Sequence, residues 1–361
     1  MLKPVSGHLE ILDKGYGFLR RLDHNFQPGP ADPFVPTPLI SANNLREGVF
    51  ITGSGVPGSS KNANLKLNSI ETINHLPAVA YANIIPLQQQ TSINPTQRFS
   101  LTTGKEDIMG KTLDRIVPVG RGQRGLVIAP PKTGKTTILK HMAGAIMANH
   151  ADASVFVLLV DERPEEVTDF KRGLTGAHVL FSSADQSIAQ HMRITRLAMN
   201  TAIRDAEVGR DTIVFIDSLT RMARAFNTET QSYGRTMTGG LAANALEIPR
   251  QLFGAARNLE HGGSLSIIAT ILIETGSRMD DIIYQEFKGT GNMDLVLSRE
   301  CSENRLWPAI DIKQSGTRKE ELLLDAEAYR EVVQLRRGLA KLDTVHAMGA
   351  LLEYLSSKSQ S

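Results

Sequence analysis

The sequence predicts an α/β protein in which a small closed β-barrel precedes a larger domain built on a mostly parallel sheet. The sheet is indicated by apolar runs of buried-strand length that alternate with helical periods, at 155–160, 179–181, 212–216 and 265–273. Another apolar strand leads through a Pro/Gly loop directly into a helical pattern. The barrel is indicated by about five short, turn-separated runs near the N-terminus. Helices should cover both faces of the sheet, with ligands at the carboxyl ends of its strands.

Length and composition exclude several classes of protein. With 361 residues and 41% hydrophobic content, the chain is long enough for about two domains with buried cores. No apolar run approaches the ~18 residues of a membrane span, and no signal-peptide pattern is present, so we expect neither a membrane partner nor secretion. The single cysteine, Cys301, excludes an intrachain disulfide and a cysteine zinc site, which fits a cytoplasmic protein. With a net charge of +2, any nucleic acid would be bound by local basic loops.

Residues 1–75 are predicted to form the barrel. Strand alternation within this segment places Tyr16, Phe18 and Arg20 on one face of a strand. Two aromatic rings and a cation on one face can stack nucleobases and hold a phosphate, with each stacked base contributing ~1–3 kcal/mol. An aromatic pair that points inward and fills the barrel would give the same pattern.

The polar, breaker-rich segment 76–118 is predicted to be a connector, and residues 119–361 are predicted to form the sheet domain with a C-terminal helical segment. The sheet domain opens with 120–125, where two arginines stand among three glycines. This composition suits a close approach of the backbone to a phosphate, and it equally suits a solvated turn.

The segment 129–137 predicts a phosphate-binding loop. It follows the pattern G-x-x-x-x-G-K-[ST], except that Ala129 stands in place of the first glycine. In such loops backbone N–H groups at a helix N-terminus hold phosphate oxygens, so Lys135 should pair with the terminal phosphates. The hydroxyl of Thr136 should reach a Mg²⁺ ion. The sequence therefore predicts a bound nucleotide with magnesium.

Two acidic residues end predicted strands close to this loop. Glu162 is a candidate for polarising the water that attacks a γ-phosphate, whereas the neighbouring Glu165 and Glu166 suit the first turn of a helix. Asp217 has the placement of a Walker B acid that holds Mg²⁺ through water. The alternative is that Asp217 or Ser218 caps the next helix.

Two later loops, 232–240 and 275–278, each present an arginine among small residues, Arg235 and Arg278. Such loops can follow the backbone of a single-stranded nucleic acid. Ordinary solvated loops have the same composition, so the pattern alone leaves both interpretations open.

Arg318 and Trp307 also have two interpretations each. Thr317 and Glu320 match a capping box, which would make Arg318 the first residue of a surface helix. Alternatively, Arg318 is an arginine finger that completes the phosphate site of a neighbouring subunit. Trp307 is either a core aromatic or a stacking plate for a nucleobase.

Taken together, seven motifs resemble those of the Rho family of transcription termination factors, and the resemblance runs from about residue 8 to 323: 120–125, 129–136, 161–167, 217–221, 253–257, 287–292 and 315–322. The resemblance implies a homohexameric ring of RecA-like ATPase domains, each preceded by an OB-fold barrel. It also implies movement along single-stranded RNA from 5′ to 3′ and release of transcripts from RNA polymerase, with ATP and Mg²⁺ as cofactors.

The resemblance assigns roles to individual residues. The implied catalytic residues are Lys135, Glu162, Asp217 and Arg318, with Thr136 and Asp217 as metal ligands. The implied nucleotide-binding residues are Gly120, Arg121, Gly122, Gln123, Arg124, Gly125, Lys132, Thr133, Gly134, Lys135, Thr136, Thr137, Arg163 and Trp307. The implied RNA-binding residues are Gly15, Tyr16, Gly17, Phe18, Leu19, Arg20, Asp32 and Phe34 in the barrel, and Arg235, Thr236, Thr238, Gly239, Thr275, Gly276 and Arg278 in two pore loops.

The sequence departs from the family pattern in three places. No helical segment precedes the barrel pattern, Ser59 and Lys61 replace a Glu and a Tyr that contact RNA, and Arg235 and Arg278 replace pore-loop lysines. The departures leave an alternative, an RNA-binding regulator whose ATPase is weak or idle. A third hypothesis is a relative of the rotary and protein-export ATPases, which share the nucleotide core without the barrel aromatics.

Overall fold

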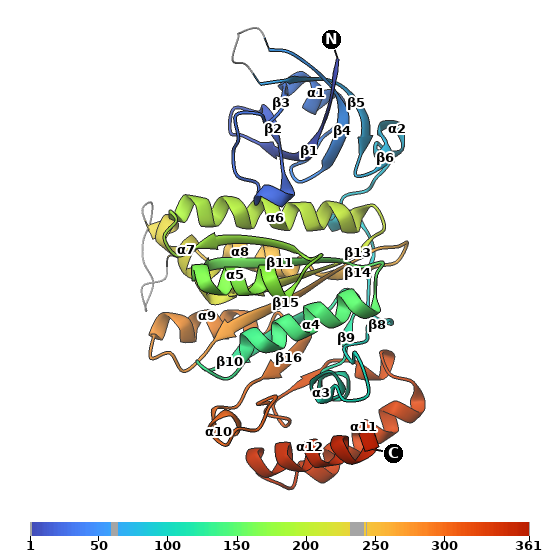
Figure 1. Ribbon diagram of the computed structural model, residues 1–361, viewed down its shortest axis with the longest axis vertical. Coiled ribbons are helices and arrows are strands. Elements are labelled where there is room, and N and C mark those ends of the chain that lie inside the picture. The colour runs from blue at the N-terminus through green and yellow to red at the C-terminus, as the bar shows by residue number, and fades with distance from the viewer. Residues whose placement is uncertain (1, 59–63, 232–241, 243, 361) are drawn as a thin grey trace.

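The computed structural model describes residues 2–58, 64–231, 242 and 244–360, and it confirms the α/β class (Figure 1). The barrel lies at one end of the molecule, the large sheet with its helices lies in the middle, and the C-terminal helices lie at the other end. No helix in this described part is long and apolar enough to cross a bilayer.

The N-terminal sheet curls into the predicted barrel. Its strand order is β3-β2-β1-β4-β5-β6, and a parallel bridge between Phe34 and Lys66 closes it. Side chains that alternate along the strands, such as Leu9, Leu19 and Ile51, fill the interior. Its elements are β1 (Lys3–Ile11), β2 (Gly17–Arg20), η1 (Leu22–His24), β3 (Phe34–Val35), α1 (Thr37–Ala42), β4 (Phe50–Val56), β5 (Lys66–Ile73) and β6 (Leu76–Pro77).

The segment 76–118, expected as a connector, contains short elements that join the rest of the fold. They are α2 (Ala78–Tyr81), η2 (Leu87–Gln89), β7 (Ser92–Ile93), β8 (Arg98–Phe99) and α3 (Ile108–Ile116). Strand β7 pairs with the large sheet through β14, and β8 pairs with β9. The domain limits expected at 75 and 118 stay predictions.

The large sheet has the order β12-β11-β13-β15-β10-β16-β17, and every pair from β12 to β16 is parallel. Antiparallel pairing occurs where β17 and β14 join it. The predicted, mostly parallel sheet is therefore confirmed. The strands of this half of the chain are β9 (Val119–Gly120), β10 (Arg124–Ala129), β11 (Ser154–Glu162), β12 (His178–Ser183), β13 (Asp211–Asp217), β14 (Arg257–Leu259), β15 (Ser264–Leu272), β16 (Met293–Val296) and β17 (Gly316–Thr317).

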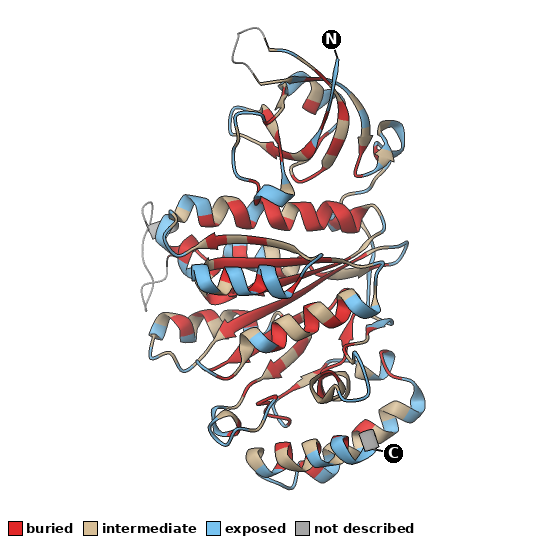
Figure 2. Cartoon of the chain, in the orientation of Figure 1, coloured by how far each residue is buried: buried red, intermediate tan, exposed pale blue. Residues whose placement is uncertain are grey.

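Helices cover both faces of this sheet because its strands are apolar on both sides. In β10, Leu126 and Ile128 pack into one hydrophobic core with α6 and α7, whereas Val127 and Ala129 pack into a second core with α4 and α12. Figure 2 shows these central strands as a continuous buried layer. The helices are α4 (Lys135–Asn149), α5 (Pro164–Gly173), α6 (Ile188–Glu207), α7 (Leu219–Gln231), α8 (Glu247–Gly254), α9 (Arg278–Lys288), α10 (Arg299–Glu303), η3 (Glu320–Leu322), α11 (Ala326–Leu339) and α12 (Thr344–Gln360).

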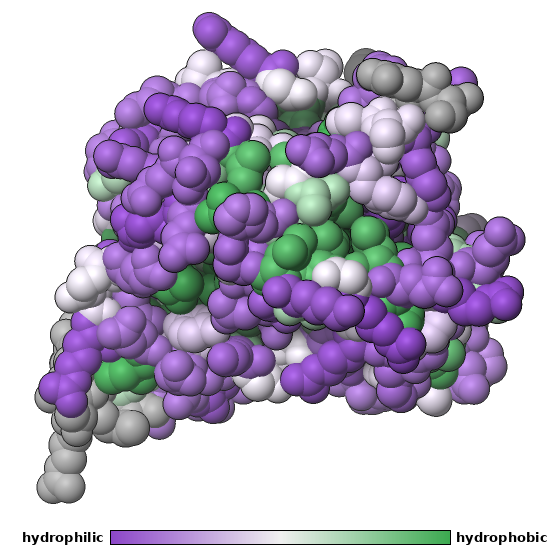
Figure 3. All heavy atoms as spheres, turned by 90° about the horizontal axis from the view of Figure 1, so that it is seen from below, coloured by the Kyte–Doolittle hydropathy of each residue, from purple (hydrophilic) through white to green (hydrophobic). Residues whose placement is uncertain are grey.

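The barrel rests on α6 through charged contacts (Figure 1). Arg193 of α6 donates to Glu10 of β1, and Glu207 at the end of α6 accepts from Arg46. Seen from the opposite end, where the C-terminal helices lie, apolar side chains gather within a hydrophilic border (Figure 3).

Candidate functional site

The predicted phosphate loop lies between β10 and α4, at the carboxyl end of the sheet. Gly134 has φ +85°, a left-handed conformation that favours glycine, and it directly precedes the 15-residue helix α4. Thr133 donates its hydroxyl to the carbonyl of Pro130 at 2.7 Å, which shapes the turn. Ala129, in place of the usual first glycine, ends β10 and packs in the core. The free N–H groups at the start of α4 are suited to holding phosphate oxygens.

Lys135 at the start of α4 pairs with Asp217 at the end of β13. Its Nζ lies 2.8 and 2.6 Å from the two carboxylate oxygens of Asp217, which is fully buried and also accepts from Thr270 at 2.8 Å. The helix that follows is capped by Ser218 and not by Asp217, because the Ser218 hydroxyl accepts a hydrogen bond from the backbone N–H of Arg221. Asp217 therefore faces the loop, where it could hold a metal ion.

Glu162, the candidate catalytic carboxylate, is buried at the end of β11. Its Oε1 lies 3.3 Å from Arg221, and its Oε2 has no partner among the residues that the structure describes. Burial raises the pKa of Glu162, and the nearby Asp217 carboxylate raises it further. A carboxylate with a raised pKa and a free oxygen is suited to accepting a proton.

The carboxylates of Glu162, Glu166 and Asp217 form a group that fits a divalent cation. One oxygen of each lies within 4.8 Å of the others. The unpartnered Oε2 of Glu162 is the kind of buried atom that a cation or its water would satisfy. Oxygen ligands of this type suit Mg²⁺. Glu166 also lies in the first turn of α5, as its sequence position predicted.

Trp307 packs over the phosphate loop. A Cβ built on Gly134 would lie 2.9 Å from its ring, so a larger residue there would displace the tryptophan. Beside the ring is an apolar cavity of about 200 Å³ that Met109, Thr137 and Ile138 also line. Trp307 is 42% exposed, which favours the stacking plate over the core aromatic. Lys132 within the loop and Arg163 directly after Glu162 are both exposed, and no ion pair holds either within the described part of the chain.

The segment 120–125 does not join this site. Parallel strands rise about 3.3 Å per residue, so β10 places Gly125 about 13 Å before Ala129, at the amino end of the sheet. The glycines serve packing there, since a Cβ on Gly122 would lie 2.3 Å from the backbone nitrogen of Asn258. Gln123 bridges the N–H of Gly120 and the carbonyl of Asn292. The segment therefore does not contact the phosphate loop of its own chain, and its expected nucleotide-binding role stays a prediction.

Arg318 lies at the same amino end of the sheet. Thr317 pairs with Met293 of β16, which is level with Gly125 of β10. The capping-box alternative is wrong, because the Thr317 hydroxyl donates to the carbonyl of Pro118 and η3 begins only at Glu320. Arg318 is exposed and cannot contact its own phosphate loop from this end.

Three aromatic rings form a cluster on the outside of the barrel. The ring centroids of Tyr16, Phe18 and Phe34 lie 5.4 to 6.0 Å apart. All three are half-buried and lie outside the barrel core, which Leu19 fills instead. The alternative of an inward aromatic pair is therefore wrong. Gly17 permits the strand pairing here, because a Cβ would lie 2.5 Å from the carbonyl oxygen of Glu10.

Arg20 is on the same side as Phe18 but is not free to bind a ligand. Its guanidinium lies 4.7 Å from the Phe18 ring and donates to Glu10 at 2.6 Å and to Asp32 at 2.5 Å. All three charged side chains are buried. Asp32 also accepts from the N–H of Gly29, and Gly15 (φ +80°) turns the chain into β2. Arg20 and Asp32 therefore stabilise the barrel, which corrects the expected contact of Arg20 with phosphate.

The first expected pore loop, with Arg235, Thr236, Thr238 and Gly239, lies outside the described residues, as do Ser59 and Lys61. The second is described: Gly276 and Arg278 are exposed, and the Thr275 hydroxyl donates to Asp280 at 2.6 Å. Asp280 also binds Arg224 of α7.

Helix α7 connects the second loop with Glu162, the candidate catalytic carboxylate. Arg224 contacts Asp280, which anchors the loop, and Arg221, one turn earlier on the same helix, contacts Glu162. The sequence reasoning assigned no role to these arginines. The sequence did indicate that Arg221 and Arg224 lie together, because their i, i+3 spacing after the strand that ends at Asp217 places both on one face of a helix.

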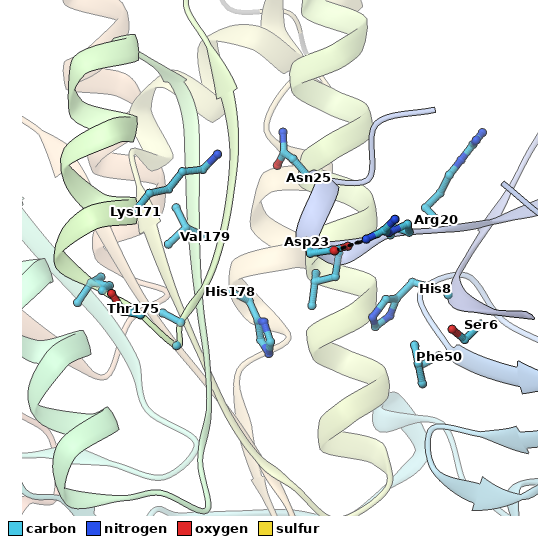
Figure 4. A pocket seen from close by; sticks show the side chains of 16 residues that line it. Ser6, His8, Arg20, Asp23, Asn25, Phe50, Lys171, Thr175, His178 and Val179 are labelled. Carbon is cyan, nitrogen blue, oxygen red and sulfur yellow. Dashed lines mark hydrogen bonds and ion pairs between the residues drawn. The ribbon is translucent and has the colours of Figure 1, made fainter. Parts of the chain in front are cut away.

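A larger cavity, of about 980 Å³, lies between the barrel and the sheet domain (Figure 4). His8 and Phe50 face it from the barrel, and Lys171 and His178 face it from the sheet domain. Burial lowers the pKa of His8 to about 4, so its imidazole is neutral at physiological pH. Asn25 closes the junction by exchanging two hydrogen bonds with the backbone of Phe181. Of the charged residues that line the cavity, Arg20 and Arg21 each pair with carboxylates, and the ammonium of Lys171 lies 4.1 Å from the Phe181 ring.

Comparison with known proteins identifies both halves of the chain. Residues 5–78 match the Rho termination factor, RNA-binding domain, and residues 110–317 match the ATP synthase alpha/beta family, nucleotide-binding domain. The chain is 43% identical to transcription termination factor Rho of Pseudomonas fluorescens biotype C over 355 residues, which is 98% of this chain and 84% of that protein. The chain belongs to the Rho family of transcription termination factors. The Rho of Escherichia coli (strain K12) is also 43% identical, over 97% of this chain and 84% of its own length.

A solved structure agrees with the ATPase fold of the sheet domain. An ATPase from the type III secretion system of pathogenic bacteria superposes with a TM-score of 0.60 and 25% identity, over 69% of this chain and 70% of that one. The OB-fold barrel and the RecA-like fold of the sheet domain are thereby confirmed, and the chain is a nucleotide-binding ATPase. Similarity to termination factors along nearly the whole chain supports transcription termination over the idle regulator and over an export ATPase.

Proposed function

We propose that the chain is a subunit of a homohexameric, ATP-driven RNA translocase that acts in the cytoplasm. It hydrolyses ATP with Mg²⁺, moves along single-stranded RNA from 5′ to 3′, and terminates transcription by releasing transcripts from RNA polymerase. The observation that carries the proposal is the convergence of Lys135, Glu162 and Asp217 beside a phosphate loop, in a chain that is Rho-like over nearly its full length.

The pair between Lys135 and Asp217 indicates how the site accepts its substrate. A terminal phosphate draws Lys135 away from Asp217, because the phosphate offers more negative charge than one carboxylate. Asp217 and the Thr136 hydroxyl are then the residues that would hold Mg²⁺, which when bound supplies positive charge to the phosphates. Glu162 orients the attacking water with its free Oε2 and accepts the proton.

The position of Arg318 supports the ring. It lies at the opposite end of the sheet from its own phosphate loop, so a role as an arginine finger requires a second subunit. On the RNA side, the aromatic cluster of Tyr16, Phe18 and Phe34 would stack bases. The loop 275–278 would contact RNA in the ring's pore, and α7 links its anchor Asp280 to Glu162.

The test is ATP hydrolysis with and without single-stranded RNA, using cytosine-rich RNA, uracil-rich RNA and single-stranded DNA side by side. We expect RNA to stimulate ATP hydrolysis. Lys135→Ala should lower the RNA-stimulated rate by at least about 100-fold. Lys140→Ala is the matched control, because Lys140 lies on the same helix and pairs with Asp169, away from the phosphate loop. A confirmed hexamer that no RNA stimulates would contradict the proposal, and an RNA-dependent function that survives Lys135→Ala would favour the regulator.

A further inference from the structure

Asp294 on β16 carries a carboxylate for which the fold provides no partner. Its Oδ1 atom is buried, and no hydrogen-bond donor contacts that atom among the residues that the structure describes. Burial raises the pKa of Asp294, whereas the nearby charges of Arg318 and Lys288 lower it. A buried acceptor without a donor makes folding less favourable, so its presence calls for an explanation other than stability.

The strand register brings Arg318 close to this carboxylate. Asp294 pairs with Gly316 of the antiparallel strand β17, and the N–H of Arg318 donates to the carbonyl of Asn292 at 2.9 Å. Alternate residues of a strand share one face, so the side chains of Asp294 and Arg318 belong to the same face of this ladder. Diagonal neighbours on one face lie about 7–8 Å apart, which is within reach of an arginine side chain.

Gly316 leaves the space between these two side chains open. It lies opposite Asp294, and a Cβ built on it would have Nη2 of Arg336, at 3.8 Å, as its nearest neighbour outside the adjacent residues. Its φ is not positive, so the backbone conformation does not require a glycine at this position. The consequence of the missing side chain is a free path from Arg318 to Asp294.

The backbone of Arg318 is fixed, while its side chain is not. The hydrogen bond to Asn292 holds the residue on one side. On the other side Lys319, with the left-handed φ of +57°, turns the chain into η3. The side chain of Arg318 is exposed, and no ion pair holds it in the part of the chain that the structure describes. Its guanidinium can therefore take several orientations from one anchored position.

Charges of opposite sign act on this guanidinium. Burial lowers the pKa of Arg124, and the nearby charges of Arg257 and Arg318 lower it further, so Arg124 and Arg318 repel each other. The charge of Arg318 in turn favours the ionised form of Asp294. An orientation toward Asp294 would therefore satisfy the unpaired acceptor and offset the repulsion.

Asp311 shows what a structural carboxylate looks like in the same region of the chain. Its Oδ1 accepts from the backbone N–H groups of Lys313 and Gln314 at 3.0 and 3.1 Å, and its Oδ2 accepts from the Gln314 amide at 2.8 Å. Both oxygens are used to shape the turn before β17. Asp294 has no comparable role in the backbone, so its carboxylate is available to a side chain.

We propose that Asp294 is a positioning residue for Arg318: it accepts hydrogen bonds from one edge of the guanidinium and directs the remaining donors toward the phosphate held by a neighbouring subunit. The inference rests on the proposed function, in which Arg318 is the arginine finger. A guanidinium has five donors in a planar fork, so it can bind a carboxylate and a phosphate at the same time. A donor oriented in advance does not have to be reorganised when charge develops on the phosphate.

The experiment is a double-mutant cycle on RNA-stimulated ATP hydrolysis by the assembled protein. We expect Asp294→Asn to lower turnover at saturating ATP and RNA at least about tenfold, with little change in the KM for ATP. Arg318→Ala should lower turnover further. The double variant should match Arg318→Ala alone, because Asp294 acts only through Arg318.

Stability separates this role from a structural one. Asp294→Asn removes a buried charge that has no partner, so its urea midpoint at neutral pH should be unchanged or higher than that of the wild type. Asp294→Glu keeps the charge and should retain more turnover than Asp294→Asn. Glu327→Gln, which neutralises an exposed carboxylate in the first turn of α11, is the matched control and should leave turnover unchanged.

The positioning role is overturned if Asp294→Asn lowers turnover by the same factor with and without Arg318. Unchanged or increased turnover in Asp294→Asn would also overturn it, because the carboxylate would then be indifferent or would oppose the phosphate. Circular dichroism identifies a variant that fails to fold, and Asp294→Ala then takes its place in the cycle. Unchanged turnover in Arg318→Ala would instead contradict the finger itself, so failure of the proposed function is distinguishable from failure of this inference.

Discussion

The barrel and the phosphate-loop site each contain cations paired with buried carboxylates, but only in the barrel do the charges balance. In the barrel, Arg20 and Arg193 neutralise Glu10 and Asp32. At the phosphate loop, three carboxylates, those of Asp217, Glu162 and Glu166, converge against two cations, because Lys135 pairs with Asp217 and Arg221 pairs with Glu162. A balanced cluster needs no ligand and stabilises the fold, whereas an excess of carboxylates leaves room for a bound cation.

This difference between the two clusters appears in the pKa values of two buried glutamates, Glu10 and Glu162. Burial opposes ionisation of Glu10, but the hydrogen bonds from Arg193 and Arg20 outweigh it and hold its pKa below the ordinary value. Burial and the Asp217 carboxylate instead raise the pKa of Glu162. The same residue type is thus stabilised as an anion in the barrel, whereas at the phosphate loop its ionised form is disfavoured.

The largest expected effect tests the unbalanced cluster. Glu162→Gln keeps the size of the side chain but cannot accept a proton, so we expect RNA-stimulated ATP hydrolysis to fall about 10²- to 10⁴-fold. Nucleotide affinity should change little, because Lys135 and the loop stay intact. Turnover at saturating ATP and RNA measures the effect. Glu165→Gln, a change in the exposed first turn of α5, is the control, and equal losses in both variants would contradict a specific role for Glu162.

The next effect tests the balanced cluster. Arg20→Ala leaves Glu10 and Asp32 buried with fewer partners, so we expect the free energy of unfolding to fall by about 3–5 kcal/mol. Urea unfolding measures it. Arg21→Ala, which removes a fully solvated pair with Asp23, should change stability little. If Arg20→Ala instead weakened RNA binding at unchanged stability, Arg20 would be a ligand and not a structural residue.

This comparison also shows what the sequence could predict. The phosphate loop was predictable because its spacing is local: Gly134, Lys135 and Thr136 are consecutive and follow a strand. The ion pairing of Arg20 was not predictable, because strand pairing brings its partners Glu10 and Asp32 to it. The packing of Gly122 was not predictable either, because its close neighbour is Asn258, far along the chain. Residue types are thus visible in sequence, while the compensation of their charges depends on long-range contacts.

The third prediction concerns the aromatic cluster of the barrel, which should affect RNA affinity, whereas the charged residues of the barrel should affect stability. Tyr16→Ala should weaken single-stranded RNA binding by ~1–3 kcal/mol without the large loss of stability expected for Arg20→Ala. Fluorescence anisotropy with a short RNA measures the affinity, in the presence of competitor for the pore. Tyr329→Ala, on α11 at the other end of the molecule, is the control. An unchanged affinity for Tyr16→Ala would remove the cluster from the RNA site.

The smallest expected effect concerns stability: the contributions of Glu10 and Glu162 to the free energy of unfolding should change in opposite directions as pH rises. Glu10 has a lowered pKa in the folded protein, so its contribution to stability is present above the ordinary value of 4.5 and is lost as pH falls through the lowered pKa. Glu162 has a raised pKa, so its contribution is present below 4.5 and is lost as pH rises through the raised pKa.

These signs can be separated with two variants of the unliganded protein. Urea midpoints from about pH 3 to pH 7 should show wild type gaining stability relative to Glu10→Gln as pH rises, and losing stability relative to Glu162→Gln. Equal slopes for both pairs would mean that the two carboxylates have the same environment, and the contrast between a balanced and an unbalanced cluster would fail. Opposite slopes would establish that ionisation of Glu162 lowers the free energy of unfolding, whereas ionisation of Glu10 raises it.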